Sequence, residues 1–129
     1  VTRDVDFVVT VDQIERAISV LAAAGFTAER HEWSVNFSSR SQLSLQLSTE
    51  DFYRDFPSRA VPADVHGILL RVASLEDTLA GKIKAWSAPE RRPSKRIKDL
   101  GDIARLVEAH PRLQATLPEH VRNALESNG

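Results

Sequence analysis

The sequence predicts an α+β fold, with a sheet built by the first half of the chain and helices built by the second half. Leu43, Leu45 and Leu47 alternate with polar residues, which is typical of a strand that buries one face. From residue 75 onward, apolar residues recur with the period of an amphipathic helix. The chain has 129 residues and no internal repeat, so we expect one domain over residues 1–129.

The first half is expected to hold short strands around one helix. Residues 3–9 are β-branched and apolar at alternate positions, which predicts a strand with Asp4 and Asp6 on its polar face. A helix is predicted to begin after Thr10 or Asp12 and to end at Gly25. Further strands are predicted over residues 27–32, 34–38, 43–48, 61–66 and 68–72, with one or two helical turns over 51–59.

Three helices are expected in the second half. Ser74, followed three residues later by Asp77, predicts a capped helix start. A second helix is predicted from about Ser94 to His110, and a last one begins after Pro118 and covers 119–125. The inward residues are expected to be Leu75, Leu79, Ile83 and Trp86 in the first helix, and Ile97, Leu100, Ala104 and Val107 in the second.

The composition excludes several classes of protein. Lys and Arg (17) nearly balance Asp and Glu (18), so the overall charge gives no reason to expect a nucleic acid or a membrane surface as partner. The absence of cysteine excludes disulfides and thiolate catalysis, and it fits a cytoplasmic protein. No apolar run is long enough to span a membrane. The histidines lack ligand spacing and no Gly-rich phosphate loop is present, so neither a zinc site nor a P-loop enzyme is supported.

Asp4 and Asp6 form the first candidate site. Their spacing of two puts both carboxylates on one face of the predicted strand, close enough to share a divalent cation. Mg²⁺ is commonly held by one or two carboxylates together with phosphate oxygens. The pattern therefore fits a metal–nucleotide site, and it equally fits a plain solvent-exposed strand face.

Lys82 and the basic segment 91–98 form the second and third candidates. Lys82 flanks the apolar stripe of its helix, where its amine either extends to solvent or reaches an anion in a cleft. The basic segment opposes the dipole at a helix start, which favours a phosphate-binding role. The alternative is a solvated face on which Lys95 pairs with Asp99 and Lys98 pairs with Asp102, the latter on the far side of the helix.

Three segments in this order resemble the nucleotidyltransferase superfamily: Thr-Arg-Asp-Val-Asp-Phe-Val-Val at 2–9, Val-Ala-Ser-Leu-Glu-Asp-Thr-Leu-Ala-Gly-Lys at 72–82, and Lys-Arg-Ile-Lys-Asp-Leu-Gly-Asp-Ile at 95–103. More narrowly, the chain resembles small bacterial proteins related to the AbiEii-type nucleotidyltransferase toxins of abortive-infection systems. The resemblance implies a mixed sheet flanked by helices, with a helical C-terminal portion.

The resemblance also implies roles for individual residues. Asp4 and Asp6 would be catalytic ligands of Mg²⁺, which binds with a nucleoside triphosphate. Lys82 and Asp99 would act in catalysis, and Lys82, Lys95, Arg96 and Lys98 would line the nucleotide site. An acceptor hydroxyl would attack the α-phosphorus and release pyrophosphate. Nucleic acid is then expected only as an acceptor.

Two departures from the family pattern bear on activity. The family's Gly-Gly or Gly-Ser segment lies upstream of the aspartate pair, where this sequence has only residues 1–3, so we expect the family's first helix and strand to be missing. Gln46 stands where a third carboxylate is expected, and its amide carries no charge. The favoured function is a truncated, weakly active or non-catalytic relative that binds Mg²⁺–nucleotide. The alternative is an active enzyme that transfers a nucleotide to RNA, a protein or a small molecule in a toxin–antitoxin or defence context.

The expected absence of the family's first helix and strand predicts self-association. Without an upstream neighbour, the strand with Asp4 and Asp6 would be an exposed sheet edge, and exposed edges pair with other chains. A homodimer is therefore expected.

Overall fold

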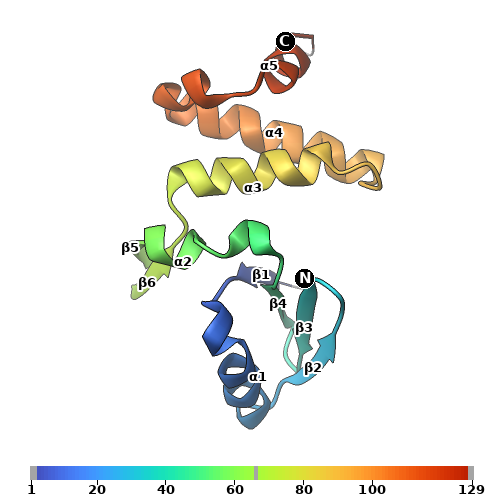
Figure 1. Cartoon of the computed structure of the whole chain (residues 1–129), viewed down its shortest axis with the longest axis vertical. Coiled ribbons are helices and arrows are strands. Elements are labelled where there is room, and N and C mark those ends of the chain that lie inside the picture. Colours follow the sequence, from blue (N-terminus) through green and yellow to red (C-terminus); the bar gives the residue numbers. More distant parts are fainter. Residues whose placement is uncertain (1–2, 66, 128–129) are drawn as a thin grey trace. The chain divides into compact units, whose positions relative to one another are not determined.

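The computed structural model describes residues 3–65 and 67–127, and these form two compact units, Val1–Ala73 and Ser74–Gly129. The first unit carries every strand found among the described residues, and the second is helical there, which confirms the α+β class (Figure 1). Within the described ranges, no helix has both the length and the apolar character needed to cross a membrane.

The first unit follows the predicted order of elements. Its elements are β1 (Arg3–Phe7), η1 (Val11–Gln13), α1 (Ile14–Ala23), β2 (Thr27–Arg30), β3 (Ser34–Ser38), β4 (Leu43–Ser48), η2 (Asp51–Tyr53), α2 (Phe56–Arg59), β5 (Val61–Val65) and β6 (Ile68–Val72). The first four strands form one mixed sheet in the order β1-β4-β3-β2. In it β1 pairs with β4 in parallel, whereas β4 with β3 and β3 with β2 are antiparallel. Among the described strands, β1 lies at one edge of this sheet.

Alternation along the strands gives this sheet one apolar and one polar face. The apolar face buries Val35, Phe37 and Leu47 against α1, which contributes Ile14 and Ile18. Asp4 and Asp6 lie on the opposite face and are exposed. The sheet therefore has a covered side that stabilises the unit and a polar side that is available for binding.

The end of α1 is fixed by Gly25, whose φ of 100° is left-handed backbone. The Gly25 amide donates to the Ala22 carbonyl at 3.1 Å, and the Phe26 amide donates to the Leu21 carbonyl at 3.0 Å. This is the pair of hydrogen bonds of a Schellman motif, which favours glycine at the left-handed position. The helix therefore ends where the sequence predicts.

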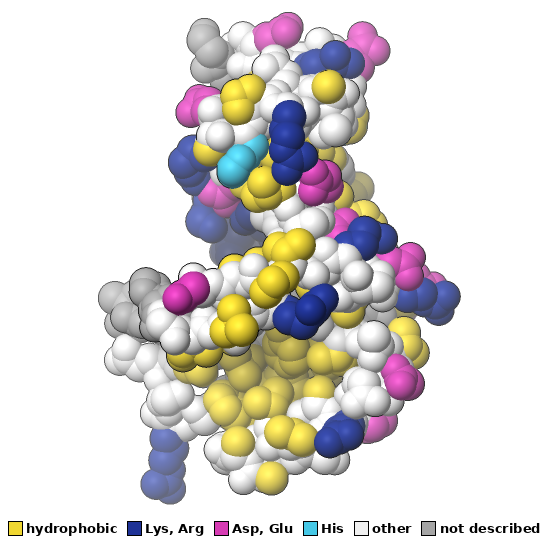
Figure 2. All heavy atoms as spheres, turned by 90° about the vertical axis from the view of Figure 1, so that its left-hand side faces the viewer, with side chains coloured by type: hydrophobic (Ala, Val, Ile, Leu, Met, Phe, Trp, Pro, Cys, Tyr) yellow, Lys and Arg dark blue, Asp and Glu magenta, His cyan; other side chains and the backbone are white. Residues whose placement is uncertain are grey.

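The strands β5 and β6 form a separate antiparallel hairpin around Gly67, as predicted. Its β6 strand exposes Ile68, Leu69 and Leu70. Figure 2 shows hydrophobic side chains on the surface over this part of the chain. A two-stranded sheet has little core of its own, so apolar side chains remain exposed on it.

The second unit consists of α3 (Leu75–Ser87), α4 (Pro93–Ala109), η3 (Pro111–Thr116) and α5 (Glu119–Ser127). The Ser74 hydroxyl accepts a hydrogen bond from the Asp77 amide at 3.1 Å, so the predicted cap of α3 is present. The core consists of Leu79, Ile103, Leu113, Leu117 and Val121, with the α3 residues Leu75, Ile83 and Trp86 packed against it. The predicted stripe of α3 is thus confirmed, whereas the short helix η3 was not predicted.

The predicted stripe of α4 is wrong at Ile97, which is 74% exposed. The buried residues of this helix are Asp99 and Ile103. At about 100° per residue, Ile97 lies about 120° around the helix from Ile103. Val107 packs against the core as predicted. Ile97, Leu100, Ala104 and Val107 also help to line a groove of about 810 Å³. Apolar residues at helical spacing do not by themselves show whether that face of the helix lines a groove or packs against the core.

Candidate functional site

The polar face of the sheet brings Asp4 and Asp6 next to β4. In the parallel β1–β4 pair, Asp4 lies opposite Ser44 and Asp6 lies opposite Gln46. Residues opposite each other on neighbouring strands share a face, so all four side chains point to the polar side. Asn36 of β3 lies opposite Gln46 and extends the polar row across the sheet.

These donors suit a hard cation that arrives with phosphate oxygens. Asp4 and Asp6 provide two carboxylates, and the Gln46 amide oxygen and the Ser44 hydroxyl are neutral oxygen donors beside them. Within residues 3–65 and 67–127, no group of three His, Cys, Asp or Glu residues could hold a metal ion. A complete protein cage is thus absent from the described part, whereas Mg²⁺ with one or two carboxylates and phosphate ligands fits the residues present.

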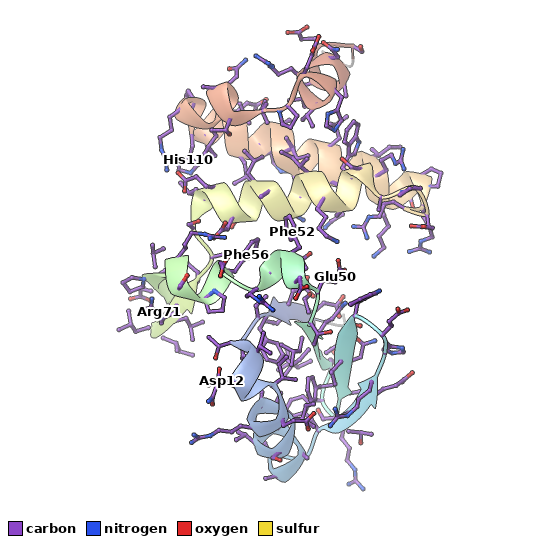
Figure 3. All side chains as sticks on the ribbon, viewed as in Figure 1. Asp12, Glu50, Phe52, Phe56, Arg71 and His110 are labelled. Carbon is purple, nitrogen blue, oxygen red and sulfur yellow. The ribbon has the colours of Figure 1, made fainter. Side chains whose placement is uncertain are left out.

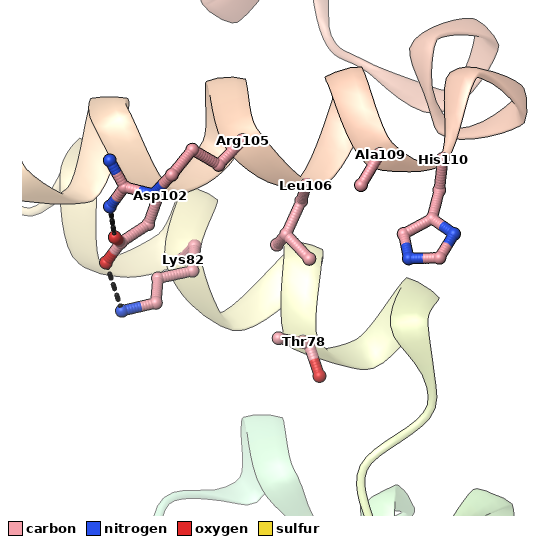
Figure 4. Close-up of a pocket in the computed structure, with 7 residues that line it drawn as sticks. All are labelled: Thr78, Lys82, Asp102, Arg105, Leu106, Ala109 and His110. Atoms are coloured by element: carbon pink, nitrogen blue, oxygen red, sulfur yellow. Dashed lines mark hydrogen bonds and ion pairs between the residues drawn. The ribbon is translucent and has the colours of Figure 1, made fainter.

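The second unit contains a cleft of about 330 Å³ between α3 and α4 (Figure 4). Asp102 lies at one end of it and accepts a hydrogen bond from the Lys82 amine at 2.8 Å. Arg105 also donates to Asp102, and the Lys98 amine lies 3.8 Å from the same carboxylate. Thr78 and His110 line the cleft further along. Lys82 therefore meets an anion in a cleft, one of its two predicted alternatives, and that anion is a side chain of α4.

These cations change the acidity of Asp102. The hydrogen bond from Lys82 holds the pKa of the Asp102 carboxyl below its ordinary value of 3.8, and partial burial opposes this effect. Asp102 is therefore ionised at neutral pH and binds Lys82 as a charged pair. Its position facing α3 differs from the prediction that it lies on the far side of the helix.

Asp99 is the most deeply buried charged residue among those described, with 2% of its surface exposed. Arg91 donates two hydrogen bonds to it, from Nε at 2.8 Å and from Nη2 at 3.0 Å. Asp99 thus pairs with Arg91 in the loop before α4, where the sequence predicted a pair with Lys95. Such a two-pronged contact ties the loop to the helix, and a catalytic role for Asp99 stays a prediction.

The other predicted phosphate-binding cations lie around the first turns of α4. Arg96 donates to the Ala88 carbonyl at 2.8 Å, and its Nε is buried without a hydrogen-bond partner among the described residues. Lys95 is exposed, and so is Lys98, which forms the predicted pair with Asp102. Arg96 is thus bound to the backbone of the loop before α4, and Lys95 and Lys98 face solvent.

The structure therefore places the predicted residues in two groups. Asp4 and Asp6 share the sheet face of the first unit, and Lys82, Lys95, Arg96, Lys98 and Asp99 belong to the second unit. The sequence analysis missed Arg91 as the partner of Asp99, and Asp102 as the partner of Lys82. Helical spacing gives neighbours within α4, such as Lys98 and Arg105 for Asp102. The contacts with Lys82 and Arg91 come instead from α3 and from the loop before α4.

The comparisons with known proteins identify the family of the chain. No curated protein matches the chain. The family model described as "Nucleotidyl transferase AbiEii toxin, Type IV TA system" matches residues 1–129. This match confirms the resemblance drawn from the three sequence segments, and it links the chain to toxin–antitoxin systems. The chain belongs to the AbiEii nucleotidyl transferase toxin family.

Proposed function

We propose that the chain binds a nucleoside triphosphate with Mg²⁺ at the polar face of its sheet, through Asp4 and Asp6. The observation that carries the proposal is the register of β1 and β4, which puts both carboxylates and Gln46 on one exposed face. Membership of a nucleotidyl transferase family supports a nucleotide as the ligand. When bound with the nucleotide, Mg²⁺ supplies positive charge that stabilises negative charge on the phosphate oxygens.

In this proposal, nucleotide transfer is weak or absent because Gln46 stands beside Asp6 in place of a third carboxylate. An amide oxygen can contact a cation, but it does not accept a proton as a general base near neutral pH. Two carboxylates still suit a cation that carries phosphate ligands. Binding with little turnover is the behaviour that these side chains support.

The second candidate function is active transfer of a nucleotide to RNA, a protein or a small molecule, in a toxin–antitoxin context and in the cytoplasm, where nucleoside triphosphates are available. The family match favours it. The acceptor hydroxyl would attack the α-phosphorus, and pyrophosphate would leave. The roles of Lys82, Lys95, Arg96, Lys98 and Asp99 in either function stay predictions, and single alanine variants test each of them in the titration below.

Isothermal titration of ATP, GTP, CTP and UTP in the presence of Mg²⁺ tests the binding. We expect heat of binding with the natural chain and none with Asp4→Ala/Asp6→Ala. The matched control is Glu119→Ala/Glu126→Ala, which removes two exposed carboxylates of α5 and is expected to leave binding unchanged. Equal heats in the natural chain and the β1 variant, or no heat in either, would contradict the proposal.

A gain-of-function variant tests the part assigned to Gln46. Gln46→Glu keeps the length of the side chain and adds a negative charge beside Asp6. An added charge near a partly hydrated cation contributes roughly 1 kcal/mol, so we expect about fivefold tighter Mg²⁺–nucleotide binding. Asn36→Asp adds the same charge one strand further away and should give a smaller gain. Transfer of labelled nucleotide to bulk RNA or protein then separates an enzyme from a binding protein.

A further inference from the structure

A cluster of aromatic side chains follows the last residue of β4. The ring centroids of Phe52 and Tyr53 are 4.9 Å apart, those of Tyr53 and Phe56 are 5.1 Å apart, and those of Phe52 and Phe56 are 5.6 Å apart. The Arg59 guanidinium lies 5.7 Å from the centre of the Phe56 ring. Figure 3 shows Phe52 and Phe56 on the segment that leaves the sheet after Glu50. Three of the eight aromatic residues of the chain are thus concentrated in one short segment.

The topology places this segment at the same end of the sheet as Asp6. Because β1 and β4 are parallel, their carboxyl ends meet at one edge, and the aromatic segment follows from that edge. Gln46, which lies opposite Asp6, precedes the start of η2 at Asp51 by five residues. Five residues span at most about 18 Å, so the cluster lies within reach of a ligand held at Asp6.

The exposure of Phe52 is the second observation. Phe52 is 40% exposed, whereas Phe37 is buried in the core of this unit and Phe7 packs against it with ring centroids 6.0 Å apart. The contacts with Tyr53 and Phe56 hold the exposed ring in place. A positioned aromatic ring binds the face of a nucleobase by stacking, and it loses little conformational freedom in doing so.

We propose that Phe52, positioned by Tyr53 and Phe56, stacks on the base of the nucleotide whose phosphates bind at Asp4 and Asp6. The inference rests on the proposed function and adds the contact that recognises the base. Every nucleobase has a π-face, so the stacking contact strengthens the binding of all four nucleotides. Discrimination among bases would need additional hydrogen bonds to their edges.

A comparison of ATP with inorganic tripolyphosphate, both with Mg²⁺, isolates the base contact. Tripolyphosphate carries the phosphate chain without a base, so it reports on the Asp4 and Asp6 site alone. We expect Phe52→Leu, which keeps an apolar side chain but removes the ring, to weaken ATP binding about 5- to 100-fold and to leave tripolyphosphate binding unchanged. Phe52→Trp, which restores a ring, is expected to bind ATP as tightly as the natural chain.

The other outcomes separate the two proposals. If the natural chain binds both ligands and Phe52→Leu binds ATP equally well, the stacking contact is refuted and the metal–nucleotide site stands. If Phe52→Leu weakens both ligands by the same factor, Phe52 acts through the fold and the stacking contact is again refuted. If the natural chain binds neither ligand, the proposed function fails, and the base contact fails with it.

Discussion

The pair of Arg91 and Asp99 makes an unequal prediction for its two partners. Asp99 is 2% exposed, whereas the Arg91 side chain is 34% exposed. Removal of Arg91 leaves a buried carboxylate without its two hydrogen bonds, while removal of the Asp99 charge leaves a guanidinium that can turn to water. We therefore expect Arg91→Leu to destabilise the second unit more than Asp99→Asn does.

The magnitudes follow from burial. Removing the partner of a buried charge lowers the free energy of unfolding by about 3–5 kcal/mol. The partial exposure of Arg91 favours the lower end of this range, about 3 kcal/mol. Asp99→Asn keeps an oxygen acceptor and loses the charge assistance of its hydrogen bonds, so about 1.5–2 kcal/mol is expected. In the double variant Arg91→Leu/Asp99→Leu no buried charge remains, and its stability should exceed that of Arg91→Leu alone.

Urea unfolding followed by tryptophan fluorescence measures these free energies. A Trp33→Phe background leaves Trp86, which packs against the core of the second unit and stacks on His120, as the single probe. Comparison of this probe with circular dichroism also tests the single-domain prediction, because coincident transitions indicate one cooperative unit. The reasoning on burial is refuted if Asp99→Asn is as destabilising as Arg91→Leu, or if the double variant is the least stable of the three.

Three further predictions concern acidity, a turn and the sheet edge. Asp102→Asn is expected to cost about 1–2 kcal/mol at neutral pH. Because the pKa of Asp102 is lowered in the fold, the difference in free energy of unfolding between the natural chain and Asp102→Asn has its whole value above about pH 5 and shrinks as pH falls below 3.8. Urea unfolding of both proteins at a series of pH values measures this difference. Gly25→Ala should lower stability by about 1–2 kcal/mol in thermal unfolding, since alanine is strained at a φ of 100°. If β1 pairs between copies, light scattering after size exclusion should find a dimer and Val5→Lys should favour the monomer; a monomeric natural chain at high concentration would contradict the edge prediction.

The fold could be predicted where local patterns decide it. Alternation at Leu43, Leu45 and Leu47 predicted a strand with one buried face, and Gly25 predicted the end of the first helix. The parallel register of β1 and β4 joins residues about forty positions apart, so no local pattern fixes it. The face of α4 was misjudged at Ile97 because this helix has two apolar sides, and only the packing of its neighbours selects one of them.

The candidate site was predictable in its residue types and less so in its contacts. The spacing of Asp4 and Asp6 was enough to place both on one strand face, and the match of Gln46 to that face followed from the resemblance. Spacing within α4 predicted the pair of Lys98 with Asp102. Arg91 and Lys82, which bind Asp99 and Asp102, lie outside this helix, and its spacing does not predict them. The aromatic segment carries no motif that identifies it, and its concentration of rings in a chain with few aromatics was the available signal.

Paramagnetic NMR tests the central claim, the metal–nucleotide site on the sheet, most directly. Mn²⁺ in place of Mg²⁺ is added with ATP to ¹⁵N-labelled protein, and the loss of amide signals near the ion is recorded. We predict the strongest losses at residues 4–6 and 44–46, and their disappearance in Asp4→Ala/Asp6→Ala. Strongest losses in α3 or α4, or losses that persist unchanged in that variant, would contradict the account.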